Sequence, residues 1–309
     1  MVTTRKISFT GPLARFQYMV LMALFRVAIT RGLFGRFARG LGRIFPAGNA
    51  AYLHLNGAPP FKIYLNDGYW TRFALWHHDY EPEIERAIMA AAGHSPLFCD
   101  LGANKGFWTV RAARLFDQVA AVEASADTFT ALHENAAELP NVTLHRAAIH
   151  ETSGQSMSFV NVTNSHASAQ LLLGGSQPEG DVETVETISI DDLVPPGTAA
   201  LIKLDVEGAE IAALTGATRA LAEGSAVLYE DHGADHDCAP SAYLLEMPDM
   251  VIWSVDDIPV RLTSVAEVRA LKTDRFRGYN FMAARKDAPL ALAIINALQK
   301  DGEPDRPAP

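Results

Sequence analysis

Cysteine is scarce in this sequence, and long uninterrupted apolar runs are absent. Only two cysteines, Cys99 and Cys238, occur among 309 residues, which is too few for a disulfide framework or a four-thiolate zinc site. We therefore expect reduced thiols in a cytoplasmic protein. With 49% apolar and 20% charged residues, the chain has the composition of a soluble globular protein and not of a disordered one.

Acidic residues are absent from the first 66 positions. Nine basic residues fall there: Arg5, Lys6, Arg15, Arg26, Arg31, Arg36, Arg39, Arg43 and Lys62. The rest of the chain has 17 basic and 36 acidic residues, so a positive arm, residues 1–66, precedes a negative body. Such an arm meets an anionic membrane or a nucleic acid, or folds back on its own domain. Nucleic acid is not the expected partner, because large apolar residues alternate with the arginines and the body is acidic.

The most apolar stretch of the arm is Phe16–Ala28, which Gln17 and Arg26 interrupt. It is shorter than the roughly 20 apolar residues of a spanning helix, and no small-residue cleavage site of a signal peptide is evident after it. Helical spacing places five apolar residues on one face: Phe16, Val20, Ala23, Leu24 and Val27. This predicts an amphipathic helix that packs on the body, with peripheral binding to an anionic membrane through residues 1–66 as the alternative.

From about residue 80, short apolar runs alternate with helix-like segments. Five runs have the continuous apolar character of strands buried on both faces of a parallel sheet: Leu97–Leu101, Val119–Val122, Val142–Leu144, Leu201–Val206 and Ala226–Tyr229. The helix-like segments are Glu81–Ala92, Phe107–Phe116, Ala126–Glu138 and Ala209–Leu221. Repeated strand–helix units of this length predict an α/β, doubly wound, mostly parallel sheet with an N-terminal helical extension.

Several other segments complete the predicted organisation. An insertion rich in Ser, Thr, Asn and Gly spans His150–Pro196 and contains two alternating segments, Ser156–Val160 and Val182–Ile190. Val251–Val255 and Tyr279–Ala283 are expected to add later, antiparallel strands. We therefore expect three parts: residues 1–79 as a basic extension with short strands, 80–286 as the main domain, and 287–309 as a C-terminal helix and disordered tail.

The segment after the first predicted strand has the form of a ligand-binding turn. Asp100 is the second-last residue of the strand, and residues 102–106 (Gly-Ala-Asn-Lys-Gly) open the following helix. Glycines let the backbone turn tightly and approach a ligand, and the helix start offers free N–H groups. A dinucleotide fingerprint would have glycine where this sequence has Asn104 and Phe107. This disfavours a nicotinamide-dependent oxidoreductase.

Glu123 ends the second predicted strand, 21 residues after Gly102. Ligands of open α/β sheets bind outside the carboxyl ends of the strands, where an acid accepts hydrogen bonds from a ribose diol. The position of Glu123 therefore predicts a ribose-binding carboxylate.

The fourth predicted strand carries charges that folding alone does not require. Lys203, Asp205 and Glu207 alternate along it, so a strand places all three on one side. Burying them unpaired would be costly, and a lysine between carboxylates relieves that cost. The two interpretations are a structural ion-pair cluster and a catalytic group.

The segments FCDLGANKGFWT, VAAVEAS and LIKLDVEGAEIAALTGA, followed by VLYEDH, resemble the FkbM family of S-adenosylmethionine-dependent methyltransferases. The resemblance runs from about Tyr80 to Ala284, and the DVEGAE segment is its most family-specific part. It implies a seven-stranded Rossmann-like sheet and O-methylation of a hydroxyl on a sugar, a glycolipid or another small molecule. It covers neither the basic arm nor any feature that names the acceptor.

The resemblance also implies S-adenosyl-L-methionine as the cofactor. It places Glu123 at the ribose and Ala148, after the third strand, near the adenine. The methionine portion is expected on the loop after the first strand, which contains Asp100, Gly102, Ala103, Asn104 and Gly106.

Methyl transfer to a hydroxyl requires alignment of donor and acceptor and removal of the acceptor proton. Asp205 is the first candidate for the general base. His232, after the fifth predicted strand, is the second, because a neutral imidazole titrates near working pH. We expect Glu207 to orient the acceptor or cap the next helix, and Lys203 to tune the carboxylates.

Two alternatives remain. Residues 230–238 (EDHGADHDC) are dense in metal-ligand types, so Asp205, Asp231 and His232 could converge on a divalent ion. The spacing matches no closed zinc pattern, and we expect no metal. The other alternative is a methyltransferase-like binding or scaffold protein without catalysis, which the intact loop and Glu123 disfavour.

Overall fold

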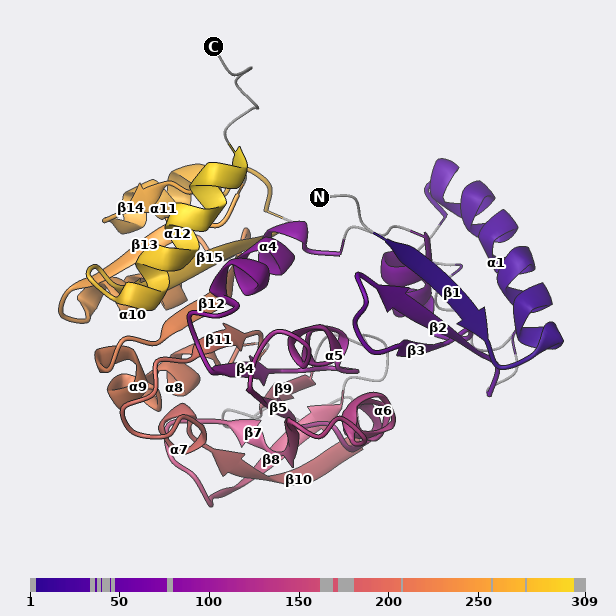
Figure 1. Ribbon diagram of the computed structural model, residues 1–309, viewed down its shortest axis with the longest axis horizontal. Helices are drawn as coiled ribbons and strands as arrows, with labels where there is room; N and C mark the ends of the chain where they lie inside the picture. Colours follow the sequence, from indigo (N-terminus) through magenta and orange to yellow (C-terminus); the bar gives the residue numbers. More distant parts are fainter. Residues whose placement is uncertain are drawn as a thin grey trace, which may run out of the picture. The chain divides into compact units, whose positions relative to one another are not determined.

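The computed structural model of the protein describes residues 4–33, 37, 40, 45, 48–76, 80–161, 169–171, 181–206, 208–256, 258–275 and 277–302. Two compact units divide the chain at Pro82. Figure 1 labels the helices and strands of both units.

The first unit is an antiparallel sheet with one long helix. Its strands pair in the order β1-β2-β3, with bounds Arg5–Phe9, Ala50–Leu55 and Phe61–Tyr64. Helix α1 covers Pro12–Thr30 and begins with a proline, which suits the first helical position. Two short helical segments follow the sheet: α3 (Gly68–Trp70) and η1 (Thr71–Trp76). The sequence analysis does not predict β1, because its two basic residues obscure the alternation of apolar and polar residues that is typical of a strand.

Helix α1 buries a different face from the apolar stripe that the sequence indicates. The buried residues are Ala14, Gln17, Leu21, Phe25 and Ala28. The predicted stripe lies one residue away along the chain, and there Phe16 is 60% and Val27 50% exposed. The expectation that this stripe packs on the protein is therefore wrong, because the chain uses its neighbouring stripe for that purpose.

The helix is also longer than the apolar run predicted from the sequence. By length and composition alone, Pro12–Thr30 could cross a membrane, so the length argument against a span is wrong. Buried helices of soluble proteins and signal sequences pass the same test.

The second unit is built on an eight-stranded sheet with the order β14-β13-β15-β12-β11-β4-β5-β6. Five strands correspond to the five predicted apolar runs: β4 (Leu97–Leu101), β5 (Gln118–Glu123), β6 (Val142–Arg146), β11 (Leu201–Leu204) and β12 (Ala226–His232). These five are parallel to one another. The predicted α/β, mostly parallel Rossmann-like sheet is thereby confirmed.

Three strands complete this sheet beyond β12: β13 (Met250–Ser254), β14 (Arg261–Leu262) and β15 (Gly278–Arg285). Strand β15 is antiparallel to β12 and β13 is antiparallel to β15, so β13 runs in the direction of the parallel strands. The expectation that both later strands are antiparallel is wrong for β13. The two-residue β14 adds an eighth strand to the expected seven.

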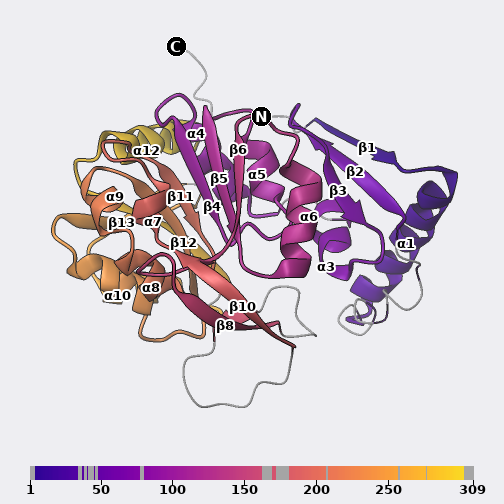
Figure 2. The same cartoon turned by 90° about the horizontal axis from the view of Figure 1, so that it is seen from below.

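Helices cover both faces of this sheet, as the views in Figures 1 and 2 show. On one face, strand residues such as Leu101, Ile202 and Tyr229 form a single core cluster with residues of five helices. Those helices are α7 (Ile190–Leu193), α8 (Glu210–Thr215), α9 (Thr218–Ala222), α10 (Ala239–Glu246) and α11 (Val265–Leu271). Both cysteines are free and belong to this core.

The remaining helices are α4 (Pro82–Ala91), α5 (Phe107–Ala112), α6 (Ala126–Ala136) and α12 (Pro289–Gly302). On the opposite face of the sheet, strand residues form hydrogen bonds with α4 and α5. Asn280 of β15 donates to Glu83 of α4 at 2.9 Å, and Thr109 of α5 donates to Asp100 of β4 at 2.6 Å. The predicted disordered tail starts at Asp301, but α12 includes Asp301 and Gly302, and residues 303–309 lie outside the described residues.

Three strands of the insertion join β7 in a second, four-stranded sheet with the order β7-β10-β8-β9. Its strands are β7 (Ala148–Ile149), β8 (Ser156–Asn161), β9 (Ala169–Leu171) and β10 (Asp181–Ile188). The long β8–β10 pair is visible in Figure 2. The predicted strand over Val182–Ile190 is too long, because Ser189 caps α7 by accepting a hydrogen bond from the Asp192 backbone N–H.

Candidate active site

The loop after β4 lies against the end of β11. Gly102 has φ +76°, and a Cβ built on it would lie 1.8 Å from the backbone oxygen of Asp205. The Asp205 N–H in turn donates to Leu101 O at 3.0 Å. Gly106 also has a left-handed φ of +87°, and its Cβ would lie 2.7 Å from Leu132 Cδ1. Both positions therefore need glycine, because the backbone is left-handed there and because neighbouring atoms of the protein leave no room for a Cβ.

Asp100 is a buried carboxylate with one oxygen held inside the protein. Oδ2 accepts a hydrogen bond from Thr109 Oγ1 at 2.6 Å, whereas Oδ1 is buried and has no hydrogen-bond partner among the described residues. Burial raises the pKa of Asp100, and Lys203 and the Thr109 hydroxyl oppose that rise. A buried, unsatisfied acceptor is unusual in a folded protein and points to a ligand donor.

Glu123 ends β5 with both carboxylate oxygens in use. Oε2 accepts from the Asn104 N–H at 3.0 Å, and Oε1 accepts from the Ser125 N–H at 2.9 Å. Burial raises the pKa of Glu123 to about 7 despite these hydrogen bonds. Each carboxylate oxygen has a second acceptor position, so Glu123 can still accept from a pair of hydroxyls.

Lys203 and Asp205 form an ion pair at the end of β11. Their Nζ and Oδ2 atoms are 3.0 Å apart, with the Lys203 side chain buried and that of Asp205 about one-third exposed. Lys203 pairs with Asp100 in the β11–β4 register. Paired residues of parallel strands project to the same side of a sheet, which explains why Lys203 acts on the Asp100 pKa.

The two predicted alanines lie beside these groups. Ala103 is buried, and its N–H donates to Val122 O at 2.9 Å. Ala148 is buried in β7 next to Ala147, whose N–H donates to Glu123 O at 3.2 Å. Ala148 also packs with Val185 of β10, so the inserted sheet contributes to this side of the site.

The structure therefore brings most of the predicted residues together at the carboxyl ends of β4, β5 and β11. The group consists of Asp100, Gly102, Ala103, Asn104, Gly106, Glu123, Ala148, Lys203 and Asp205. The roles assigned to the individual side chains stay predictions.

His232 forms no hydrogen bond or ion pair with this group in the part of the chain that the structure describes. His232 is the last residue of β12, and not a residue beyond it, because that strand extends three residues further than predicted. Its side chain is exposed, and Nδ1 accepts from the Ala234 N–H at 3.1 Å. Glu207 lies outside the described residues.

No group of three or more potential metal ligands occurs within the part of the chain that the structure describes. Asp231, one residue of the candidate metal group, is fully buried and engaged elsewhere. Its Oδ1 pairs with Lys272 Nζ at 2.5 Å, and its Oδ2 accepts from Ser241 Oγ at 2.6 Å.

Sequence reasoning missed several residues that support the site. Thr109 holds Asp100, and the Ser125 N–H holds Glu123. Glu230 follows Tyr229, which pairs with Leu204 in the β11–β12 register, so it lies level with Asp205 on the adjacent strand. A threonine near the start of a helix is too common to indicate a site residue. A predicted β12 longer by one residue would have included Glu230 at the carboxyl end of the strand.

This strand order, with a glycine loop after β4 and an acid at the end of β5, is the arrangement of a Rossmann-like methyltransferase. Residues 100–270 match the family model described as the Methyltransferase FkbM domain. The chain belongs to this methyltransferase family, which confirms the resemblance found in its sequence.

One curated relative is the hexuronic acid methyltransferase AglP of Haloferax volcanii, which is 28% identical over 156 residues. The match covers 49% of this chain and 62% of AglP, so this chain spans less than two-thirds of that relative.

Two solved structures also match. Methyltransferase FkbM from Methylobacillus flagellatus KT is 18% identical with a TM-score of 0.39, over 62% of this chain and 43% of that one. SMU.1697c, a putative methyltransferase from Streptococcus mutans in complex with SAH, is 13% identical with a TM-score of 0.38, over 67% and 98%.

Proposed function

We propose that the protein transfers a methyl group from S-adenosyl-L-methionine to a hydroxyl of a sugar. The observation that supports this most is the set of carboxylates at the strand ends, in which Asp100 keeps an unsatisfied buried oxygen and Glu123 keeps free acceptor positions. Membership in a methyltransferase family gives this set its chemical meaning. Among the described residues, nothing favours the oxidoreductase alternative.

The residues present fit the cofactor. Glu123 would accept hydrogen bonds from the ribose hydroxyls, and Asp100 Oδ1 would receive a donor from the methionine portion. Ala148 would lie against the adenine, on a surface that includes Val185. When bound, S-adenosylmethionine supplies an electrophilic methyl group on a positively charged sulfur.

Asp205 is the proposed general base. Its carboxylate is partly exposed, so an acceptor can approach it, and Lys203 holds one of its oxygens at 3.0 Å. The ammonium group of Lys203 fixes the orientation of the carboxylate and lies level with Asp100. Removal of the hydroxyl proton by such a base contributes about 10²–10⁴-fold to a rate.

The acceptor class rests on the relative from Haloferax volcanii. That protein is described as a hexuronic acid methyltransferase, and it supports testing uronic acids before other sugars. A hydroxyl acceptor would also explain the need for a general base, because a hydroxyl group loses its proton far less readily than a thiol group does.

The test is methyl transfer from ¹³C-methyl S-adenosylmethionine to free and glycan-linked hexuronic acids, with the product detected by NMR. We expect an O-methyl resonance with wild-type protein. Asp205→Asn should lower kcat by about 10²–10⁴-fold and change S-adenosylhomocysteine affinity less than about threefold, since a base acts on the acceptor.

Asp191→Asn is the matched control, because Asp191 lies in α7 and accepts hydrogen bonds from the backbone N–H groups of Arg219 and Ala220. This variant should keep kcat within a few-fold of wild type. Methyl transfer to nitrogen or carbon, or cofactor binding with no transfer to any sugar, would contradict the proposal. The second result would favour a binding protein.

A further inference from the structure

Helix α1 has a second apolar stripe beside the one that it buries within its own unit. We define the outer face of α1 as Leu13, Phe16, Met19, Leu24 and Val27. Their exposed fractions range from 39% to 64%. Ten large apolar side chains are exposed among the described residues, and half of them lie on this helix. Clustering of this kind marks an interaction surface, whereas single exposed apolar residues are normal.

Basic side chains border the outer face. Arg15 and Arg26 are exposed on α1, and neither forms an ion pair within the described part of the chain. No acidic residue occurs before Asp67 to offset them. An apolar face bordered by arginines complements a surface that has an apolar interior and anionic groups at its boundary.

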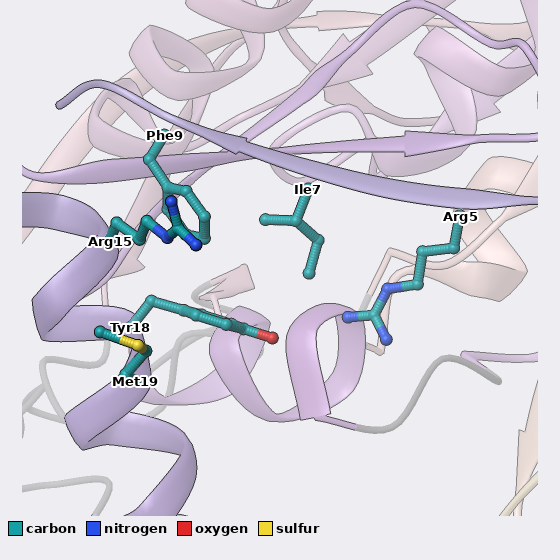
Figure 3. A pocket seen from close by; sticks show the side chains of 6 residues that line it. All are labelled: Arg5, Ile7, Phe9, Arg15, Tyr18 and Met19. Carbon is teal, nitrogen blue, oxygen red and sulfur yellow. The ribbon is translucent and has the colours of Figure 1, made fainter. Parts of the chain in front are cut away.

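A pocket of about 410 Å³ opens between α1 and β1. Figure 3 shows Arg5 and Arg15 toward its two ends, with the Tyr18 hydroxyl pointing toward Arg5 and the Arg15 guanidinium beside Phe9. Arg5 is fixed in place, because its Nη2 donates to Leu75 O at 2.7 Å. Two guanidinium groups and a phenol around apolar walls suit a phosphate that carries a hydrophobic tail.

The outer face is poorly suited to a symmetric dimer. In a two-fold dimer the same surface meets itself, and residues 1–66 contain no acid that could offset Arg15 and Arg26 at such an interface. A helix that spans a bilayer is also disfavoured, because the inner face of α1 packs on protein. There Leu21 and Phe25 are fully buried, and Asn49 Nδ2 donates to Gln17 Oε1 at 2.6 Å.

We propose that the outer face of α1 docks on an anionic phospholipid bilayer. The helix lies along the surface with its apolar side chains among the upper acyl chains, Arg26 lies at the phosphate level, and the pocket beside Arg15 accepts one headgroup phosphate. The proposal is independent of methyl transfer, because it concerns only the first unit.

The test is flotation of the full-length protein with vesicles of phosphatidylcholine alone or mixed with phosphatidylglycerol. We expect recovery with the mixed vesicles, weakened by high salt. Phe16→Glu combined with Val27→Glu should lower the partition coefficient at least tenfold. Ile258→Glu is the matched control, because Ile258 is 63% exposed in the second unit, and it should leave the partition coefficient unchanged.

Single arginine variants separate the pocket from general charge. Arg15→Gln and Arg26→Gln each remove one exposed positive charge from α1, but only Arg15 lines the pocket. Arg15→Gln should therefore weaken binding to the mixed vesicles several-fold more than Arg26→Gln. Equal losses would overturn the assignment of the pocket to a headgroup.

Circular dichroism and thermal unfolding establish that each variant is folded. Leu13→Gln combined with Met19→Gln gives a second, uncharged test of the same face, and should also reduce flotation. Equal recovery of wild type and both double variants would overturn the proposal. So would retention on the vesicles after an alkaline carbonate wash, which indicates a spanning helix, or a wild-type dimer that the double variants dissociate.

Discussion

Burial governs the ionisation of the two carboxyl groups proposed to hold the cofactor, Asp100 and Glu123. It raises the pKa of both, that of Glu123 to about 7. Lys203 and Thr109 oppose the rise at Asp100, and backbone N–H groups oppose it at Glu123. A ligand that donates hydrogen bonds to these groups would lower their pKa values again.

Binding of S-adenosylhomocysteine should therefore strengthen as the pH rises toward about 7. The raised pKa of Glu123 means that the ligand-free folded protein binds a proton near neutral pH, and hydrogen-bond donors favour the ionised form. Binding then releases that proton, and affinity gains up to about tenfold per pH unit below the pKa. Calorimetric titrations across this range would measure the slope. Glu123→Gln should flatten it, and an unchanged slope in that variant would refute the assignment.

The same pKa shift has a consequence for stability without ligand. A glutamate titrates at 4.5 in the unfolded chain and at about 7 here. The contribution of Glu123 to stability is thus fully present below about 4.5 and is lost as the pH rises to about 7. Denaturant titrations should show that, as the pH rises between these values, the free energy of unfolding falls less in Glu123→Gln than in wild type. Parallel pH profiles for the two proteins would show that Glu123 ionises as in the unfolded chain.

Gly102→Ala tests the close approach of the loop to Asp205. The added methyl group would meet the Asp205 backbone oxygen at 1.8 Å, so the end of β11 must move. We expect a loss of at least about 2 kcal/mol in the free energy of unfolding. Gly154→Ala is the control, because Gly154 has the same φ of +76° in open space. A similar, small loss in both variants would show that the contact with Asp205 is unimportant.

At the scale of helices and strands, apolar runs were enough to predict the parallel strands and their order of appearance. The carboxyl ends of parallel strands meet at one edge, so Asp100, Glu123 and Asp205 could be placed together before any coordinates. His232 could not, because the length of β12 depends on its pairing with β15. The packed face of α1 could not either, because the helix has two apolar stripes and only the tertiary structure selects one.

A buried ion pair joins β12 to the end of α11. Asp231 and Lys272 have side chains that are 0% and 2% exposed, and Ser241 donates to the second carboxylate oxygen of Asp231. Lys272→Met leaves a buried carboxylate without its cation, and we expect a loss of about 3–5 kcal/mol in stability. Urea unfolding would measure it. Asp231→Asn combined with Lys272→Met should recover part of the loss, and no recovery would show that packing of the lysine stem dominates.

At the scale of the whole molecule, the chain consists of two compact units. Positive and negative charges are also concentrated in different parts of the chain. The first 66 residues contain only basic charges, and the remainder is strongly acidic. The proposed cofactor residues all lie in the second unit. Substrate chemistry and surface attachment are therefore expected to be separable by mutation.

Calorimetric unfolding of the full chain should reflect this division. S-adenosylhomocysteine at about 100 times its Kd adds about 2.7 kcal/mol to the stability of the state that binds it. If the two units unfold in separate transitions, only the one that contains β4 and β5 should move to higher temperature. A shift of both transitions by the same amount would show that the units unfold as one.

Calorimetric titration of S-adenosylhomocysteine into the full-length protein tests the central claim most directly. We predict micromolar binding to wild type, a large loss in Glu123→Ala, and wild-type affinity in Glu138→Ala, which removes an exposed acid after α6. NAD should not bind. Absence of S-adenosylhomocysteine binding to folded wild-type protein, or equal affinity in both variants, would contradict the account.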